Sequence, residues 1–185
     1  MKIPKSWDEI TISQFKELQS IQSDNELTAE IERISILTDS DPEEIRSLPI
    51  ADFNKLRSEA YNILSTPIPN EPKLKIEVGG KKFGMIPDLN FISAGEWVDI
   101  ENFSKDSNGN IHLICAVLWR PIIWEDGDDW KISPHTTEGF QKRADLFLNN
   151  LPITAVWGGL VFFSTFATGC MEIILDYSAG VEDQK

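Results

Sequence analysis

A run of 21 residues without a charged side chain, from Leu151 to Met171, constrains the fold of this chain more than any other feature. Such a run has to be covered by protein or by lipid, and its length meets the criterion for a membrane-spanning helix. Lys142 and Arg143 on one side also satisfy the positive-inside rule. Serine, threonine, proline and glycine dilute its hydrophobicity, so we expect a long apolar helix buried in protein, with membrane insertion as the lesser alternative.

Two adjacent glycines, Gly158 and Gly159, lie inside this expected helix. Glycine within a helix costs about 1 kcal/mol relative to alanine, so a pair of glycines needs a compensating reason. The missing Cβ allows two backbones to approach closely. We therefore expect both glycines to be helix-packing residues, in contact with a second helix of the same chain or of a neighbouring subunit in a homo-oligomer.

The first third of the chain carries several helix start signals. Asp41-Pro42-Glu43-Glu44 is the strongest, because it combines an N-cap acceptor, a proline at the first helical position and carboxylates in the first turn. Thr11 with Gln14 forms a capping-box pattern for an earlier helix. Between these signals, apolar residues recur at helical spacing at Leu27, Ile31, Ile34 and Leu37. These patterns predict short amphipathic helices.

A proline-rich stretch follows these helices, at residues 67–73. Proline removes a backbone donor and stops helices, so this stretch is the best candidate for a linker. We expect an N-terminal helical lobe at 1–66 and a second lobe at 74–185 that combines a hairpin with C-terminal helices. One continuous domain is the alternative.

A β-hairpin is predicted near residues 74–85. Leu74, Ile76 and Val78 alternate with charged residues, and Gly79-Gly80 supply the positive φ angles of a two-residue turn. Beyond it, the sequence predicts a helix capped by Ser93 and Glu96, a loop at 106–109, a buried helix at 111–119 and another helix that lies beyond Pro134 and ends at Asn149-Asn150. The expected fold class is therefore mainly α (α+β): a bundle of short helices with one β-hairpin and a long apolar C-terminal helix.

One acidic cluster resembles a metal site: Glu125, Asp126, Asp128 and Asp129. The segments on each side of it, 122–124 and 130–132, look extended. Calcium loops space their ligands around a later glycine and close with a distant glutamate, and neither feature is present here. The cluster is therefore expected to be a solvated turn at Gly127, and no metal ligand is predicted.

Signatures of catalysis are also missing from the sequence. The chain has two histidines and contains no nucleophile elbow, zinc spacing or Walker loop. His112 lies in an apolar run, where a packed side chain is expected, and Cys115 and Cys170 are expected to be small buried hydrophobes. We therefore expect no catalytic residue, no cofactor and no enzymatic activity.

Charge further limits the partners. Thirty acidic and 17 basic residues give a net charge of -13, which would repel nucleic acid. The excess has two interpretations: it keeps the protein soluble, or it complements a basic partner. A protein partner would bind through exposed aromatic residues, and the candidates are Trp7, Phe15, Trp97, Trp119 and Trp124. For each of them, packing in the core is the alternative.

Five segments together resemble bacteriophage tail assembly chaperones: IPKSWDEITISQFKEL, LTDSDPEEIRSLPIADFNKL, MIPDLNFISAGEWVDIENF, IHLICAVLWRP and LPITAVWGGLVFFSTF. The resemblance implies a protein of the host cytoplasm that holds the tape-measure protein soluble while a tail is built. It also extends to virion proteins of crAss-like and related phages. A head-tail connector, tail or virion cargo component is therefore the alternative function, and neither function implies a catalytic residue.

Overall fold

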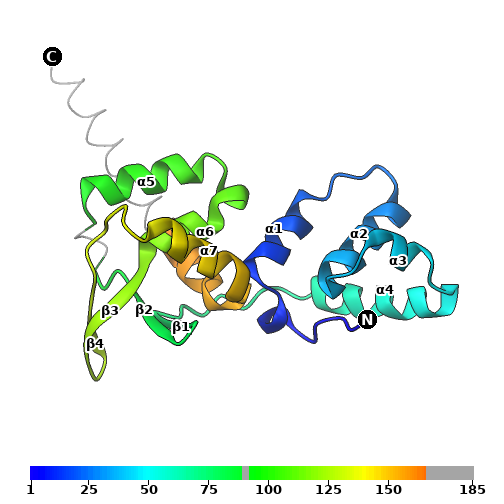
Figure 1. Ribbon diagram of the computed structural model, residues 1–185, viewed down its shortest axis with the longest axis horizontal. Helices are drawn as coiled ribbons and strands as arrows, with labels where there is room; N and C mark the ends of the chain where they lie inside the picture. The colour runs from blue at the N-terminus through cyan, green and yellow to red at the C-terminus, as the bar shows by residue number, and fades with distance from the viewer. Residues whose placement is uncertain (89–91, 166–185) are drawn as a thin grey trace, which may run out of the picture.

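A computed structural model of the chain describes residues 1–88 and 92–165. Figure 1 shows a group of N-terminal helices beside a second group in which helices cover a small sheet. The N-terminal elements are η1 (Trp7–Glu9), α1 (Ile12–Ser20), α2 (Glu26–Thr38), α3 (Pro42–Arg46) and α4 (Ile50–Leu64). The others are β1 (Lys75–Val78), β2 (Lys81–Met85), α5 (Ala94–Ser104), α6 (Ser107–Leu118), β3 (Trp119–Asp126), β4 (Asp129–Ile132), α7 (Phe140–Asn150) and η3 (Ile153–Ala155), followed by a helical segment at 157–165.

The predicted helix starts are confirmed, because each depends on a hydrogen bond within a few residues. Thr11 accepts from the Gln14 amide and Gln14 accepts from the Thr11 amide, which completes the first capping box. Asp41 caps α3 with Pro42 in the first turn. The prediction of burial is wrong for one residue: Leu27 was expected in the buried stripe of α2, and it is 55% exposed.

The single predicted hairpin is part of a larger sheet. Gly79 and Gly80 have φ angles of +57° and +68°, and they join β1 to β2 as expected. β2 then pairs with β3, with Met85 opposite Trp119, to give a four-stranded antiparallel sheet in the order β1-β2-β3-β4. The expected α+β class is confirmed, and the single hairpin is corrected to a four-stranded sheet, because pairing between β2 and β3, which are distant in sequence, leaves no local signal.

The long helix predicted from Leu151 is also corrected. The Leu151 carbonyl accepts from the Ile12 amide and the Ile10 carbonyl accepts from the Ile153 amide, so Leu151 and Pro152 are extended beside the start of α1, and the short 3-10 helix η3 follows. The helical segment begins only at Trp157, and residues 166–171 of the predicted helix lie outside the described residues. Within 1–88 and 92–165, no helix is both long and apolar enough to cross a membrane.

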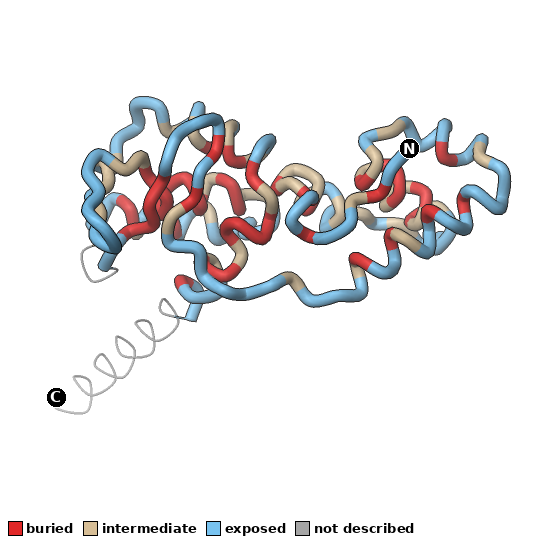
Figure 2. Tube along the Cα trace, turned by 90° about the horizontal axis from the view of Figure 1, so that it is seen from below, coloured by how far each residue is buried: buried red, intermediate tan, exposed pale blue. Residues whose placement is uncertain are grey.

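A second helix start differs from its prediction. Asp106 was expected to open a loop, and instead its carboxylate accepts from the Gly109 amide and caps α6, which begins at Ser107. The loop prediction counted polar residues, whereas an aspartate before a helix is a favoured N-cap. Figure 2 shows that α6 leads into the most continuous buried part of the trace. Its last residues, with Trp119, are fully buried.

The proline-rich linker is attached at both ends by tryptophans. The Trp7 indole donates to the Thr66 carbonyl at 3.0 Å, and the Trp119 indole donates to the Lys73 carbonyl at 3.2 Å. Between these points the linker is largely exposed, and Figure 2 shows it as a pale run beneath the buried core. α1 contacts α2 on one side and α6 and α7 on the other, so it lies between the two groups of helices.

Candidate protein-binding groove

An apolar groove of about 650 Å³ lies between α5, α6 and the helical segment 157–165, with Phe15 of α1 at its border. Its apolar lining consists of Phe15, Trp97, Ile100, Ile111, Ile114, Trp157, Leu160, Val161 and Phe163. Its polar lining consists of Glu101, Ser104, Ser107, Asn108, Ser164 and Thr165. Pockets of this size bind ligands or the anchor side chains of a partner.

Helical periodicity produces the walls of this groove. On α5, the residues at 97, 100, 101 and 104 face it, and on the segment 157–165 the residues at 157, 160, 161 and 164 do so. Both sets follow the i, i+3, i+4, i+7 spacing of one helix face. α6 contributes Ile111 and Ile114, which follow its polar first turn in the sequence. The groove is therefore built from three helix faces, of which two are only partly covered.

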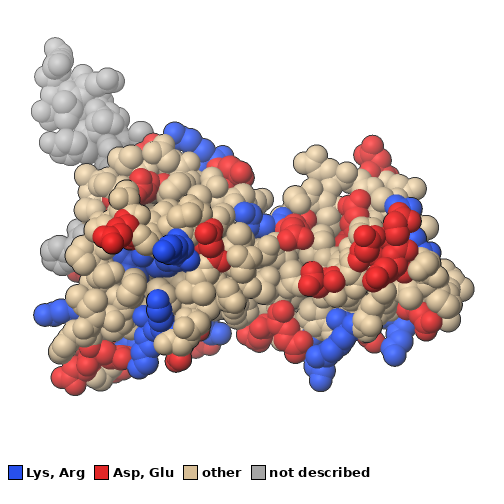
Figure 3. Space-filling view, viewed as in Figure 1, with Lys and Arg blue, Asp and Glu red and all other residues tan. Residues whose placement is uncertain are grey.

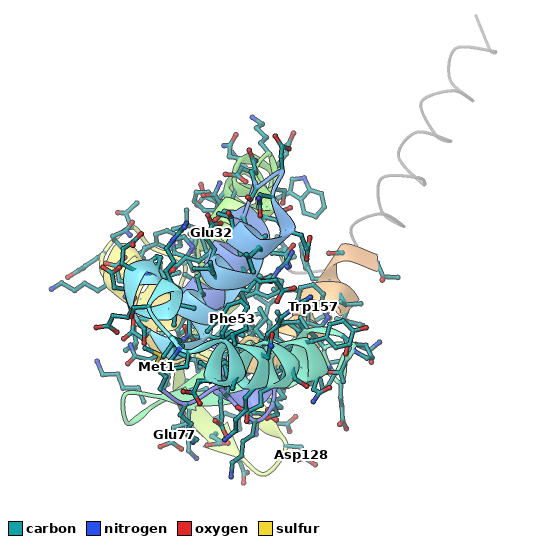
Figure 4. All side chains as sticks on the ribbon, turned by 90° about the vertical axis from the view of Figure 1, so that its right-hand side faces the viewer. Met1, Glu32, Phe53, Glu77, Asp128 and Trp157 are labelled. Carbon is teal, nitrogen blue, oxygen red and sulfur yellow. The ribbon has the colours of Figure 1, made fainter. Side chains whose placement is uncertain are left out.

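Aromatic contacts hold the segment 157–165 in place between α1 and α5. The Phe15 and Trp157 rings meet edge to face with centroids 5.6 Å apart, and the Trp97 and Phe163 rings lie 6.4 Å apart. Figure 4 shows Trp157 at the start of this segment. Edge-to-face pairs of this kind contribute about 0.5–1.5 kcal/mol beyond the area that they bury. They connect the groove to the core.

The aromatic residues predicted to bind a partner do not lie together. Trp97 and Phe15 both line the groove, but Phe15 is buried. Trp7 and Trp119 are also buried, because their indoles anchor the linker, so the expectation that these three side chains are exposed is wrong. Trp124 is 47% exposed on β3, away from the groove, where Lys131 lies over its ring.

The two glycines predicted to pack against a helix contact other parts of the chain. A Cβ on Gly158 would overlap the backbone of Glu71 in the linker. A Cβ on Gly159 would overlap the Trp119 ring. The approach is therefore close, but the neighbours within the described residues are a linker and a buried tryptophan and not a second helix. Contact with a neighbouring subunit stays a prediction.

An ion pair that the sequence analysis missed fixes α5 to the start of β3. Glu96 Oε1 lies 2.8 Å from Arg120 Nη1, and both side chains are buried. Glu96 Oε2 accepts from the amide and hydroxyl of Ser93, each at 2.7 Å. Burial would raise the pKa of the Glu96 carboxyl, but the Ser93 hydrogen bonds and the Arg120 charge outweigh it and hold that pKa below its ordinary value.

A second contact on the same side involves the next turn of α5. Asp99 Oδ2 lies 2.8 Å from His135 Nε2, in the loop before α7. Asp99 is three residues from Glu96, so the two carboxylates share one helix face. The apolar face that lines the groove is thereby held at a fixed orientation to the sheet and to α7.

Within the acidic cluster at the β3–β4 turn, Glu125 pairs with two lysines. Glu125 accepts from Lys82 at 2.9 Å and from Lys75 at 3.0 Å, and these hydrogen bonds lower the pKa of its carboxyl. Lys75 also donates to the Gly127 carbonyl at 3.0 Å, and Gly127 has a φ of +57°. In the part of the chain that the structure describes, no three His, Cys, Asp or Glu side chains gather as a metal site.

His112 and Cys115 lie on α6, behind the groove. The Cys115 thiol is fully buried, and burial raises its pKa well above the ordinary value, so it remains protonated. Lys16 Nζ lies 3.5 Å from His112 Nδ1. Burial and the Lys16 charge both lower the pKa of His112 from 6.5, so the neutral imidazole is favoured. Cys170 lies outside the described residues.

This arrangement predicts a pH effect on stability. Because the pKa of His112 is lower in the folded state, the unfolded chain binds a proton more readily, and stability should decrease as pH falls below 6.5. In His112→Gln, the free energy of unfolding should depend less on pH as it falls from 6.5 toward the lowered pKa. Urea denaturation of both proteins across this range measures the difference. Parallel curves would show that the His112 proton is not linked to folding.

Comparisons of the chain with protein-family models, with curated proteins and with solved structures found no match. The function is therefore inferred from the geometry of the groove and from the residues that form it.

Proposed function

We propose that this chain is a non-enzymatic binding protein that holds an amphipathic helix of a partner protein in the groove between α5, α6 and residues 157–165. The observation that carries the proposal is the groove itself, with two helix faces whose apolar side chains are Trp97 and Ile100 on α5, and Trp157, Leu160 and Val161 on the segment 157–165. The resemblance to tail assembly chaperones supports the tape-measure protein of a bacteriophage as the partner. Binding would keep that long helical protein soluble until the tail is assembled.

The chemistry of the groove suits a helical ligand. Helix-in-groove recognition places anchors at i, i+3, i+4 and i+7 into an apolar channel, and a partly exposed tryptophan such as Trp97 is a common anchor point. Val161 is 38% exposed on the opposite wall, so both walls retain apolar surface for a ligand. Figure 3 shows acidic side chains gathered over α2 and α3, where they favour solubility.

Two exposed valines on neighbouring helices provide a direct test. Val161 lines the groove, whereas Val98 is 52% exposed on α5 and does not. On co-expression with the tape-measure protein of the same phage, Val161→Asp should reduce the co-purified partner at least ten-fold, because an unpaired carboxylate would be buried in the contact. Val98→Asp should retain it.

Circular dichroism melting of both variants establishes that the fold is intact, since both positions are exposed. Equal retention of the partner by Val161→Asp and the parent chain would exclude the groove as the binding site.

A virion structural component is the second candidate, and an apolar surface remote from the groove favours it. Ile123 and Trp124 are 64% and 47% exposed on β3, and a permanent subunit interface would cover such residues as well as the groove. Mass spectrometry of purified virions separates the two functions. The structural component remains in the mature particle in stoichiometric amount, whereas the chaperone is absent from it.

A further inference from the structure

The groove has one charged residue in its lining, and that residue, Glu101, is acidic. An adjoining hollow shares Asn108 with the groove and contains Glu17, Asp106 and Lys16. Lys16 extends toward His112, with its Nζ 3.5 Å from the imidazole.

A second adjoining hollow shares Phe15, Asn108 and Trp157 with the groove and contains Arg33, which is paired with Glu26 and Glu30. Carboxylates therefore outnumber cations in the lining of the groove and of the hollow with Glu17 and Asp106.

Glu101 differs from the other acidic residues of α5 in having its charge available. Glu96 is paired with Arg120, and Asp99 contacts His135. Glu101 is exposed, and within residues 1–88 and 92–165 no lysine or arginine forms an ion pair with it. A ligand in the groove would meet this carboxylate at the edge of its apolar contact.

We propose that the helix bound in the groove is cationic, with lysine or arginine beside its apolar face to pair with Glu101 and to approach Glu17 and Asp106. This inference rests on the proposed function. Charges at the rim of an interface select partners and accelerate association, while the apolar anchors supply most of the affinity. The net charge of -13 acts in the same direction at longer range. An acidic helix with the same apolar face is excluded by repulsion.

Two labelled helical peptides of about 18 residues test the proposal against the full-length chain. Both carry leucine at i, i+3, i+4 and i+7, and they differ only in flanking lysines or flanking glutamates. Fluorescence anisotropy at low salt should show at least ten-fold tighter binding of the lysine peptide. The preference should shrink at about 1 M salt, where the Debye length is roughly 3 Å.

Variants of the chain locate the effect. Glu101→Gln should weaken binding of the lysine peptide about three-fold, as expected for a rim ion pair. Glu44→Gln removes the same charge from exposed α3 and should leave binding within experimental error. If it weakens binding as much as Glu101→Gln does, net charge selects the ligand and the assignment to Glu101 is overturned.

The peptide results also separate the two proposals. Equal affinity for both peptides overturns the cationic ligand but leaves the groove as a helix-binding site. Binding of neither peptide contradicts the proposed function itself. Val161→Asp should abolish binding of the lysine peptide, and retention of full affinity by this variant would place the contact elsewhere.

Discussion

Replacement of Glu96 by alanine should lower the free energy of unfolding by roughly 3–5 kcal/mol, because it leaves Arg120 charged and without its partner inside the protein. The change also removes the two hydrogen bonds that the Glu96 carboxylate accepts from Ser93, whereas the bond from the Glu96 amide to the Ser93 hydroxyl remains. Glu101→Ala is the matched control: it removes a carboxylate from the same helix at an exposed position, and should change stability by less than about 0.5 kcal/mol.

A double variant identifies the cause of the loss. Replacing a whole buried ion pair by apolar residues is often neutral, whereas breaking it is costly. Glu96→Ala combined with Arg120→Met should therefore recover much of the stability that Glu96→Ala loses, apart from the contribution of the cap. Urea denaturation measures all four proteins. If the double variant is no more stable than Glu96→Ala, the unpaired charge is not the source of the effect.

The ion pair also shows which features the sequence could predict. The role of Glu96 in capping was predictable from Ser93 three residues earlier, because a capping box is local. Its pairing with Arg120 was not, since these residues are distant in sequence and meet only when α5 packs against the start of β3. The helix starts at Thr11 and Asp41 and the turn at Gly79-Gly80 were predictable for the same local reason.

The candidate site was predicted less well than the helices. Trp7 and Trp119 were selected as exposed tryptophans, but the exposure of a large aromatic ring depends on what the folded chain brings against it. The i, i+3, i+4, i+7 spacing at 97–104 and 157–164 was present in the sequence. Periodicity identifies such faces without showing which face is covered by another element and which remains partly open.

The helix predicted directly after α7 was wrong because the backbone groups that bond to this segment belong to residues far away in the sequence. The Leu151 carbonyl accepts from the Ile12 amide and the Ile153 amide donates to the Ile10 carbonyl, so Leu151 and Pro152 are extended and the short 3-10 helix η3 follows. The helical segment can begin only afterwards, at Trp157. This offset puts Trp157 against Phe15 and gives the two glycines their close neighbours.

Gly158 and Gly159 lie so close to other parts of the chain that larger side chains there should destabilise the fold. Replacing both residues by leucine should destabilise the fold by about 3 kcal/mol or more, although leucine is the better helix former. At Gly158 the added side chain meets the linker backbone at Glu71. At Gly159 it meets Trp119, which is fully buried and donates its indole hydrogen to the Lys73 carbonyl. Both obstacles are rigid, so the segment 157–165 would be displaced from the core.

Gly95 provides the control for this experiment. It lies in α5, and a Cβ there would meet no atom within 4 Å. Gly95→Ala should therefore raise stability, by up to about 1 kcal/mol, whereas Gly159→Ala should lower it. Urea denaturation gives the sign and size of each change. Because displacement of 157–165 removes one wall of the groove, the double leucine variant should also lose the lysine peptide. A double leucine variant as stable as the parent would show that neither contact limits the packing of this segment.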